Sequence, residues 1–383
     1  MAHMTNPLAT PDQLFQRRSL GALPMELQDM IFFSTQCLTQ AAGLLLQLPQ
    51  SVTAQANVLL ARYWLVENMM AHEFSVRFSS SGLSLSPNDE PKKLNGVVLQ
   101  DVSAATLYLV AKLSSHPVSP RDVAYIYTYL LSSCSAFFHD PSSPPPPPPP
   151  PPFGPETTTT TTTTSTPSPS EKNTITPYLS PAAYQSFHAR LLHLEGLILA
   201  ALGFDTHVAL PHPLAITYLQ ALDFFSFHKD GGGSKEAGKK ALAARTVAYL
   251  NTALLSPQVL YLTHQPPALA VAAVYSAARD VGAKMPECEW WEVFDVEREE
   301  LGFLVVGMRS VEGWGRKMRG DMKEVMGGRE RGMLMRKDVE GELKRRGLMI
   351  VGDEVQNGSK MMVDAEEEAA KRLDEKMAEM ESG

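Results

Sequence analysis

Two charged side chains each stand alone in an apolar helical stretch. Lys112 is the only formally charged residue between positions 101 and 121, and Glu195 is the only one between positions 190 and 205. Burying such a charge is costly unless it is paired. A cation and an anion of this kind can bind the backbone of a docking segment through charge-assisted hydrogen bonds. The alternative is a lysine that extends to solvent from a helix end and a glutamate at the rim of a helix face.

No pattern of catalytic or metal-binding residues accompanies these charges. There is no Cys-x-x-Cys, no Glu-flanked histidine pair and no Gly-x-Ser-x-Gly. Gly233–Lys239 matches most of a phosphate-binding loop, but Lys240 follows where Ser or Thr must hold magnesium, and the segment before it is predicted to be helical. We interpret it as a surface loop. The sequence therefore predicts a protein that is not an enzyme, with no catalytic residue, no cofactor and no metal site.

Helical periodicity surrounds both charges. Residues 101–113 form a predicted helix with Lys112 at its exit, and the helix that carries Glu195 is predicted to start at the Ser180 cap and to stop at Gly203. Apolar spacing predicts further helices over residues 24–48, from Ser51 onward, and over residues 120–138, 211–227, 237–255, 267–281 and 297–308. Since no convincing period-two strand appears, the ordered part is predicted to be all helical.

Two of these helices look like copies of each other. Ser103–Lys112 reads SAATLYLVAK and Ala270–Arg279 reads AVAAVYSAAR, so Tyr108 aligns with Tyr275 and the basic exit residues align too. Small residues on one face allow neighbouring helices to pack closely. A helix used twice in this way indicates a duplicated helical module, which is more often a docking surface than an active site.

Low-complexity sequence interrupts the helical pattern. Residues 79–99 are predicted to be a loop, and residues 140–177, with Pro144–Pro152 and Thr157–Thr164, a disordered Pro/Thr-rich insertion. The proline run is a candidate ligand for an SH3 or WW domain, the alternative being a spacer without a partner. From residue 312 onward aromatic residues nearly vanish and charges rise, so we expect solvated helices or disorder there.

Composition narrows the class of protein. The 383 residues suffice for two domains with tails, and a net charge of −8 argues against direct nucleic-acid binding. No apolar run of about 18 residues could cross a membrane. Three widely spaced cysteines are typical of the cytosol or the nucleus, where thiols stay reduced.

These segments together resemble the cyclin box, and the nearest likeness is to cyclin L, which is related to cyclins M and K. The resemblance spans about Leu23 to Met308. It is carried by Lys112 with the following Arg121 and Asp122, Gln40–Gln50, Glu195 in HLEGLILAALGF, His207–Pro213 and the WWEVF segment Trp290–Phe294. Many cyclins carry acidic residues just after the lysine, whereas this chain has Ser114 and Ser115, which leaves the identity of the partner open.

The resemblance implies an all-α fold of two tandem five-helix cyclin-box domains, with the disordered insertion and a charged helical C-terminal extension. We expect an N-terminal tail over residues 1–22, whose first four residues are typical of a cloning scar. The first box is predicted over 23–205, the second over 206–311, and the extension over 312–383.

In cyclins the corresponding Lys and Glu contact the kinase partner, which implies this role for Lys112 and Glu195. We expect both side chains to lie together where their helices meet. The chain is then predicted to be a regulatory subunit that activates a cyclin-dependent Ser/Thr kinase of the class associated with cyclin L. The expected setting is transcription and pre-mRNA splicing in the nucleus, with splicing or transcription factors as further candidate partners.

Three alternatives remain open. The first is another transcription cyclin of the M, K or C type. The second is a kinase-independent adaptor of the general transcription factor IIB type, which requires a basic face on the second box; Lys239, Lys240 and Arg245 are few for that purpose. The third is a purely structural helical scaffold.

Overall fold

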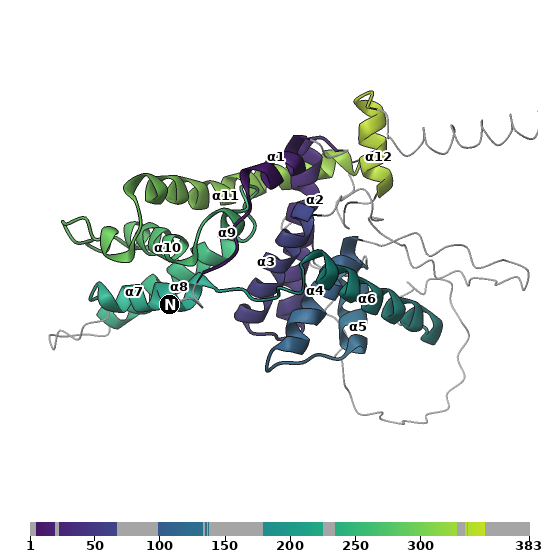
Figure 1. Ribbon diagram of the computed structural model, residues 1–383, viewed down its shortest axis with the longest axis horizontal. Helices are drawn as coiled ribbons and strands as arrows, with labels where there is room; N and C mark the ends of the chain where they lie inside the picture. Colours follow the sequence, from purple (N-terminus) through teal and green to yellow (C-terminus); the bar gives the residue numbers. More distant parts are fainter. Residues whose placement is uncertain are drawn as a thin grey trace, which may run out of the picture. The chain divides into compact units, whose positions relative to one another are not determined.

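The computed structural model describes residues 5–19, 23–66, 99–132, 179–224, 234–327 and 336–348, together with Ser135, Phe137 and Leu334. In this part of the chain every regular element is a helix, which confirms the predicted all-α class (Figure 1). None of the described helices is long and apolar enough to span a membrane. The loop predicted before residue 99 and the insertion predicted over residues 140–177 lie outside the described residues.

Five helices form a first group around a central helix. They are α2 (Met25–Leu45), α3 (Gln50–Val66), α4 (Leu99–Leu113), α5 (Pro120–Leu131) and α6 (Pro181–Ala201). Helix α4 packs against the other four helices of this group (Figure 1). Its buried face contains Ala104, Ala105 and Ala111, which are fully buried. These small side chains let the backbones of the neighbouring helices come close.

A second group of five helices repeats this plan. It contains α7 (Pro211–Ala221), α8 (Ser234–Ala253), α9 (Leu260–Thr263), α10 (Pro266–Val281) and α11 (Arg298–Val325), with a short 3-10 turn at Glu292–Phe294. Helix α10 packs against α7, α8, α9 and α11. The two repeated sequences lie in α4 and α10, the central helices of their groups, so the predicted tandem five-helix arrangement is confirmed. Residues Asp205–Leu210 connect the groups, while the domain boundaries remain predictions.

Hydrogen-bonded caps fix the ends of the helices that carry the candidate site. Ser180 accepts a hydrogen bond from the backbone N–H of Ala183 at 3.2 Å, and Pro181 opens α6 as predicted. Beyond its end, Gly203 has a φ of 58°, which favours glycine.

Inside the first group, Ser103 Oγ lies 2.7 Å from both Thr39 Oγ1 and Tyr127 Oη. This buried chain of hydroxyls links α2, α4 and α5.

Two of the helix boundaries that were predicted wrongly share a local cause. Helix α5 was expected to reach residue 138 but ends at Leu131, where Ser132 turns to extended backbone and its hydroxyl bonds to Tyr129 O. The segment Gly233–Lys239 was interpreted as a surface loop, yet α8 begins at Ser234. Local composition misled in both cases, because a capping serine and a glycine run each fit either a loop or a helix end.

The last long helix also differs from its prediction. It was expected to end at Met308, with solvated sequence from residue 312, but α11 continues to Val325. Buried residues recur along it at every third or fourth position: Leu304, Met308, Val311, Gly315, Met318, Met322 and Val325. The ring of Trp314 packs edge-on against Phe33 of α2 with centroids 5.2 Å apart. The charge-rich composition had concealed this apolar stripe.

The N-terminal segment is more than the predicted tail. Residues Pro11–Ser19 form helix α1, which packs against α3. Before it, Asn6 is 5% exposed and its side chain bonds both backbone groups of Ala209, at 2.8 Å to the O atom and 2.7 Å from the N–H. We call residues 5–19 the N-terminal arm. A single buried asparagine leaves no periodic signal in a sequence, so pattern alone missed the arm.

A separate compact unit begins at Arg336. It contains helix α12 (Arg336–Arg345), in which Glu342 pairs with Arg345 at 2.9 Å and with Arg346 at 2.8 Å. Charge pairs one turn apart stabilise an otherwise polar helix. Residues 349–383, which belong to the extension predicted to be solvated helices or disorder, lie outside the described residues.

Candidate functional site

Lys112 and Glu195 form an ion pair between two packed helices. Lys112 occupies the last turn of α4 and Glu195 the middle of α6, and Lys112 Nζ donates to Glu195 Oε1 at 2.7 Å. The two residues are 83 positions apart in the sequence, with the whole insertion between them, so only the packing of α4 on α6 brings them together. The expectation that both side chains lie together is confirmed.

The two partners differ strongly in exposure. The Lys112 side chain is 52% exposed, whereas that of Glu195 is 10% exposed. The hydrogen bond to Glu195 raises the pKa of the Lys112 ammonium group above its ordinary value, so the lysine stays charged. The ring of Tyr108 lies beneath the ammonium group, with its centroid 5.7 Å away. An ammonium group has three donors, and the bond to Glu195 uses one. The other N–H donors of Lys112 can bind carbonyl oxygens of another molecule.

The rim of this pair contains hydroxyl and apolar groups. Ser114 Oγ donates to Ala111 O at 2.8 Å and accepts from the backbone N–H of His116 at 3.0 Å, so this serine helps to end α4. Leu113 beside the lysine is 62% exposed, and Leu192, one turn before the glutamate, is 46% exposed. Apolar side chains around a half-buried ion pair are typical of the centre of a protein interface.

A second ion pair between α4 and α6 was missed by the sequence analysis. Arg190 Nε donates to Asp101 Oδ2 at 2.7 Å, and the aspartate side chain is 2% exposed. Burial raises the pKa of the Asp101 carboxyl group, against the opposing effect of Arg190. Asp101 is the nearest charged residue before Lys112, and Arg190 is the nearest one before Glu195. The same search for isolated charges could therefore have suggested that these two residues pair. Together the two pairs hold α6 along α4.

The arrangement provides groups that can bind another molecule. Lys112 offers donors, Glu195 orients them, and the leucines offer apolar contact area. In the part of the chain that the structure describes, no group of three or more His, Cys, Asp or Glu side chains is placed to hold a metal ion. Chemistry of this kind recognises the backbone and the apolar side chains of another protein.

Known proteins with similar sequences are cyclin L proteins. The chain is 37% identical over 115 residues to an uncharacterised cyclin-L1-like protein of Schizosaccharomyces pombe, a match that covers 30% of this chain and 39% of that protein. It is 22% identical to chicken cyclin-L1 and 23% identical to human cyclin-L2, each over 265 residues that cover 69% of this chain and 36% of the relative. The matches thus span less than half the length of these relatives. No family model matches the chain.

The fold is also found in a solved structure. A chain in the crystal structure of the yeast RNA Pol II CTD kinase CTDK-1 complex superimposes with a TM-score of 0.52 and 12% sequence identity, covering 92% of this chain and 89% of that one. At this level of identity the likeness concerns the fold alone. The sequence relatives confirm the predicted resemblance to cyclin L.

Proposed function

We propose that this chain, a cyclin L-like protein in sequence and fold, is the regulatory subunit of a cyclin-dependent Ser/Thr kinase. The Lys112–Glu195 pair is the observation that carries the proposal. It offers a charged donor, held by a nearly buried carboxylate at 2.7 Å and flanked by exposed leucines. In the cyclins that the chain resembles, a lysine and a glutamate at these places contact the kinase. The chain itself would supply no catalytic group.

The mechanism would be activation by docking. A kinase is active only when an ion pair forms between a lysine of its β3 strand and a glutamate of its αC helix. A partner that binds the helix only in its inward position shifts the kinase population toward that active state. In this proposal the exposed donors of Lys112 bind carbonyl oxygens of the kinase, and Leu113 and Leu192 bury apolar area beside them. Glu195 holds the lysine in the binding orientation.

The setting of this activity rests on the cyclin L resemblance. We place the kinase complex in the nucleus, with Ser/Thr-Pro substrates among factors of transcription and pre-mRNA splicing. The cyclin L names of the sequence relatives support this assignment.

Affinity capture from nuclear extract tests the proposal. The purified chain is immobilised, extract of its own organism is passed over it, and mass spectrometry identifies what stays bound. We expect one cyclin-dependent kinase in near-equal amount, together with kinase activity toward a Ser-Pro peptide. Both Glu195→Arg and Lys112→Ala should abolish capture. Glu195→Arg is the harsher change, because it places a second cation opposite Lys112 at a position that is only 10% exposed.

A matched control separates loss of the site from general charge effects. Glu287→Arg breaks another Lys–Glu pair, with Lys284 at 2.9 Å, in which both side chains are strongly exposed, at 83% and 85%. This variant should capture the kinase like the unmodified chain. Recovery of polymerase or DNA-bound factors without a kinase would overturn the function in favour of an adaptor. Kinase capture that survives both site variants would refute the role of the pair.

A further inference from the structure

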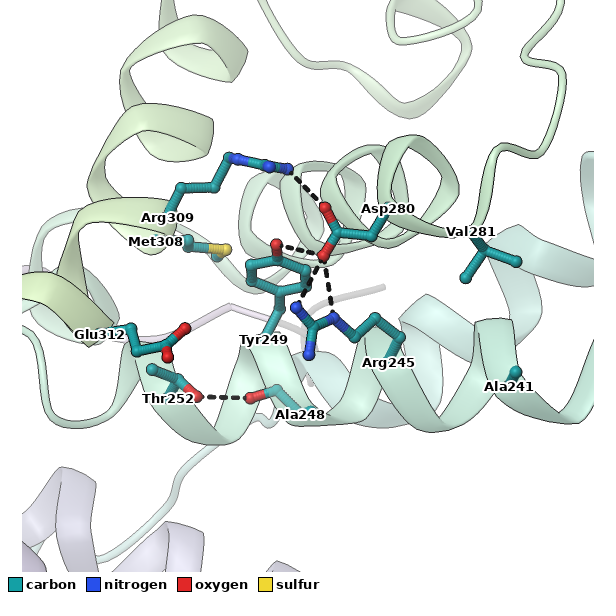
Figure 2. A pocket seen from close by; sticks show the side chains of 10 residues that line it. All are labelled: Ala241, Arg245, Ala248, Tyr249, Thr252, Asp280, Val281, Met308, Arg309 and Glu312. Carbon is teal, nitrogen blue, oxygen red and sulfur yellow. Dashed lines mark hydrogen bonds and ion pairs between the residues drawn. The ribbon is translucent and has the colours of Figure 1, made fainter.

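A polar groove lies in the second helical group, between α8, α10 and α11. It encloses about 640 Å³. Its lining residues are Ala241, Arg245, Ala248, Tyr249, Thr252, Asp280, Val281, Met308, Arg309 and Glu312 (Figure 2). We call it the Asp280 groove. These residues belong to neither the Lys112–Glu195 pair nor its rim, and α4 and α6 take no part in the groove.

Three donors converge on one carboxylate at the centre of this groove. Tyr249 Oη and Arg245 Nε donate to Asp280 Oδ2 at 2.7 and 2.9 Å, and Arg309 Nη1 donates to Oδ1 at 2.9 Å (Figure 2). The hydrogen bond from Tyr249, with those of both arginines, lowers the pKa of the Asp280 carboxyl group. The aspartate is therefore ionised, and it fixes two guanidinium groups from different helices beside each other.

The cluster carries more positive than negative charge. Two guanidinium groups face one carboxylate, and their side chains remain 52% exposed for Arg245 and 45% exposed for Arg309. Asp280 itself is only 19% exposed, so the two guanidinium groups are the more exposed charges at this cluster, while the second carboxylate of the lining, Glu312, is 71% exposed. Each guanidinium has five N–H donors, and the bonds to Asp280 use a minority of them. Prearranged arginines lose little conformational freedom on binding an anion.

The surroundings of the arginines suit a peptide. Ala241 and Ala248 of α8 and Val281 of α10 supply small apolar walls, and Met308 lies at the buried floor. The acidic rim residue Glu312 is paired with Arg316 at 2.6 Å, which offsets its charge. A small apolar residue next to an anionic group would fit such a groove.

We propose that the Asp280 groove binds a phosphorylated serine or threonine in a peptide segment, with Arg245 and Arg309 as the phosphate ligands. Arginine forks bind phosphate oxygens through paired hydrogen bonds, and the apolar walls accept the neighbouring side chain. Nucleic acid is disfavoured, because duplex or single-strand binding needs a continuous basic stripe. The groove offers two cations in a chain of net charge −8. The inference concerns this chain alone and holds with or without a kinase partner.

Fluorescence anisotropy with a labelled peptide tests this site. The probe is a twelve-residue peptide with one phosphoserine followed by proline, compared with its unphosphorylated form and with a twelve-nucleotide single-stranded RNA. We expect the phosphopeptide to bind at least about ten-fold more tightly than the unphosphorylated peptide. Arg245→Gln and Arg309→Gln should each weaken binding by about the same factor, and the double variant should remove the preference for phosphate.

Control variants separate binding from folding. Arg279→Gln removes the same charge next to Asp280 in the sequence but outside the groove. The guanidinium carbon of Arg279 lies over the ring of Tyr275, 5.9 Å from its centroid. This variant should bind the phosphopeptide normally. Ala241→Glu places a carboxylate one helical turn before Arg245 on α8, where it can pair with that arginine, so it should compete with the phosphate and weaken phosphopeptide binding. Circular dichroism and the thermal midpoint verify that each variant is folded.

Three outcomes would overturn the proposal. The first is equal affinity for phosphorylated and unphosphorylated peptide. The second is phosphopeptide binding that survives Ala241→Glu and both arginine variants in folded protein. The third is RNA binding as tight as that of the phosphopeptide, which would identify a general polyanion surface. In the first two cases the arginines would mainly join α8, α10 and α11 through Asp280.

Discussion

At the scale of single residues, an ion pair of this protein joins a nearly buried side chain to an exposed one. The Glu195 side chain is 10% exposed and depends on Lys112, while Lys112 is 52% exposed and retains its hydration in part. Removing the lysine would leave a poorly solvated carboxylate without its partner. Removing the glutamate would leave a lysine that water can solvate. The two single substitutions should therefore differ in cost.

A double-mutant cycle tests this asymmetry. Lys112→Met should lower the free energy of unfolding more than Glu195→Gln does, and the double variant should recover part of the loss. We expect a coupling energy of about 0.5–1 kcal/mol, because the exposed lysine limits the strength of the pair. Urea denaturation of all four proteins measures it. The exposed Lys284–Glu287 pair serves as a control without measurable coupling. Equal effects of both single variants would contradict this interpretation.

At the scale of elements, close backbone approach decides which helices can pack. Gly43 of α2 faces Thr53 of α3, and a Cβ atom at residue 43 would lie 2.7 Å from Thr53 Cγ2. Thr53 is 2% exposed and has little room to move. At Gly315 of α11, by contrast, a Cβ would lie 3.4 Å from the ring of Phe33, which is ordinary contact. Glycine is therefore needed for space at residue 43.

Substitution of Gly43 should expose this constraint. We expect Gly43→Ala to lower the free energy of unfolding by roughly 1–3 kcal/mol, because overpacking outweighs the gain in helix propensity. Gly320→Ala is the matched control on α11. A Cβ added at Gly320 would have no atom within 4 Å, so this variant should be more stable by up to about 1 kcal/mol. Urea denaturation compares the two, and a stabilising Gly43→Ala would show that α2 and α3 can separate at little cost.

At the scale of the whole molecule, polar contacts join the two helical groups. Gln50 of α3 donates to Asn251 Oδ1 of α8 at 3.0 Å, and His212 Nε2 of α7 lies 2.9 Å from the same oxygen. Arg62 of α3 donates to the backbone O of His207 at 2.8 Å. The N-terminal arm adds a further tie: Asn6 binds the segment between the groups, and α1 packs on α3.

Loss of the Asn6 side chain should weaken the contact between the N-terminal arm and the segment that joins the two helical groups. Asn6→Ala leaves both backbone groups of Ala209 without their bonds at a residue that is 6% exposed. We expect a loss of about 1–3 kcal/mol in unfolding free energy and faster amide exchange at Ala209. Asp12→Asn, at an exposed position in the first turn of α1, is the control: it should leave exchange at Ala209 unchanged and lower stability less than Asn6→Ala does. Unchanged exchange at Ala209 would show that the arm does not hold the junction.

Acid should weaken the same junction. Burial lowers the pKa of His212 below its ordinary value of 6.5, so the folded state binds fewer protons than the unfolded state. Stability therefore falls as the pH drops through about 6.5 and below. The thermal midpoint between pH 7 and pH 5 measures this slope, and His212→Gln should reduce it. Burial also lowers the pKa of His264, so part of the slope should remain. An unchanged slope in His212→Gln would contradict the assignment.

The sequence by itself determined most of the helices, the repeat and the two isolated charges. Apolar periodicity and capping residues act over a few positions, so they are readable in one dimension, and the copies in α4 and α10 marked the centre of each group. Only the tertiary structure decided which charges meet. The partners Asp101 with Arg190, and Asp280 with Arg245 and Arg309, come from helices far apart in the chain. The course of α11 beyond residue 312 and the place of Asn6 also depend on packing between distant segments, which no local pattern records.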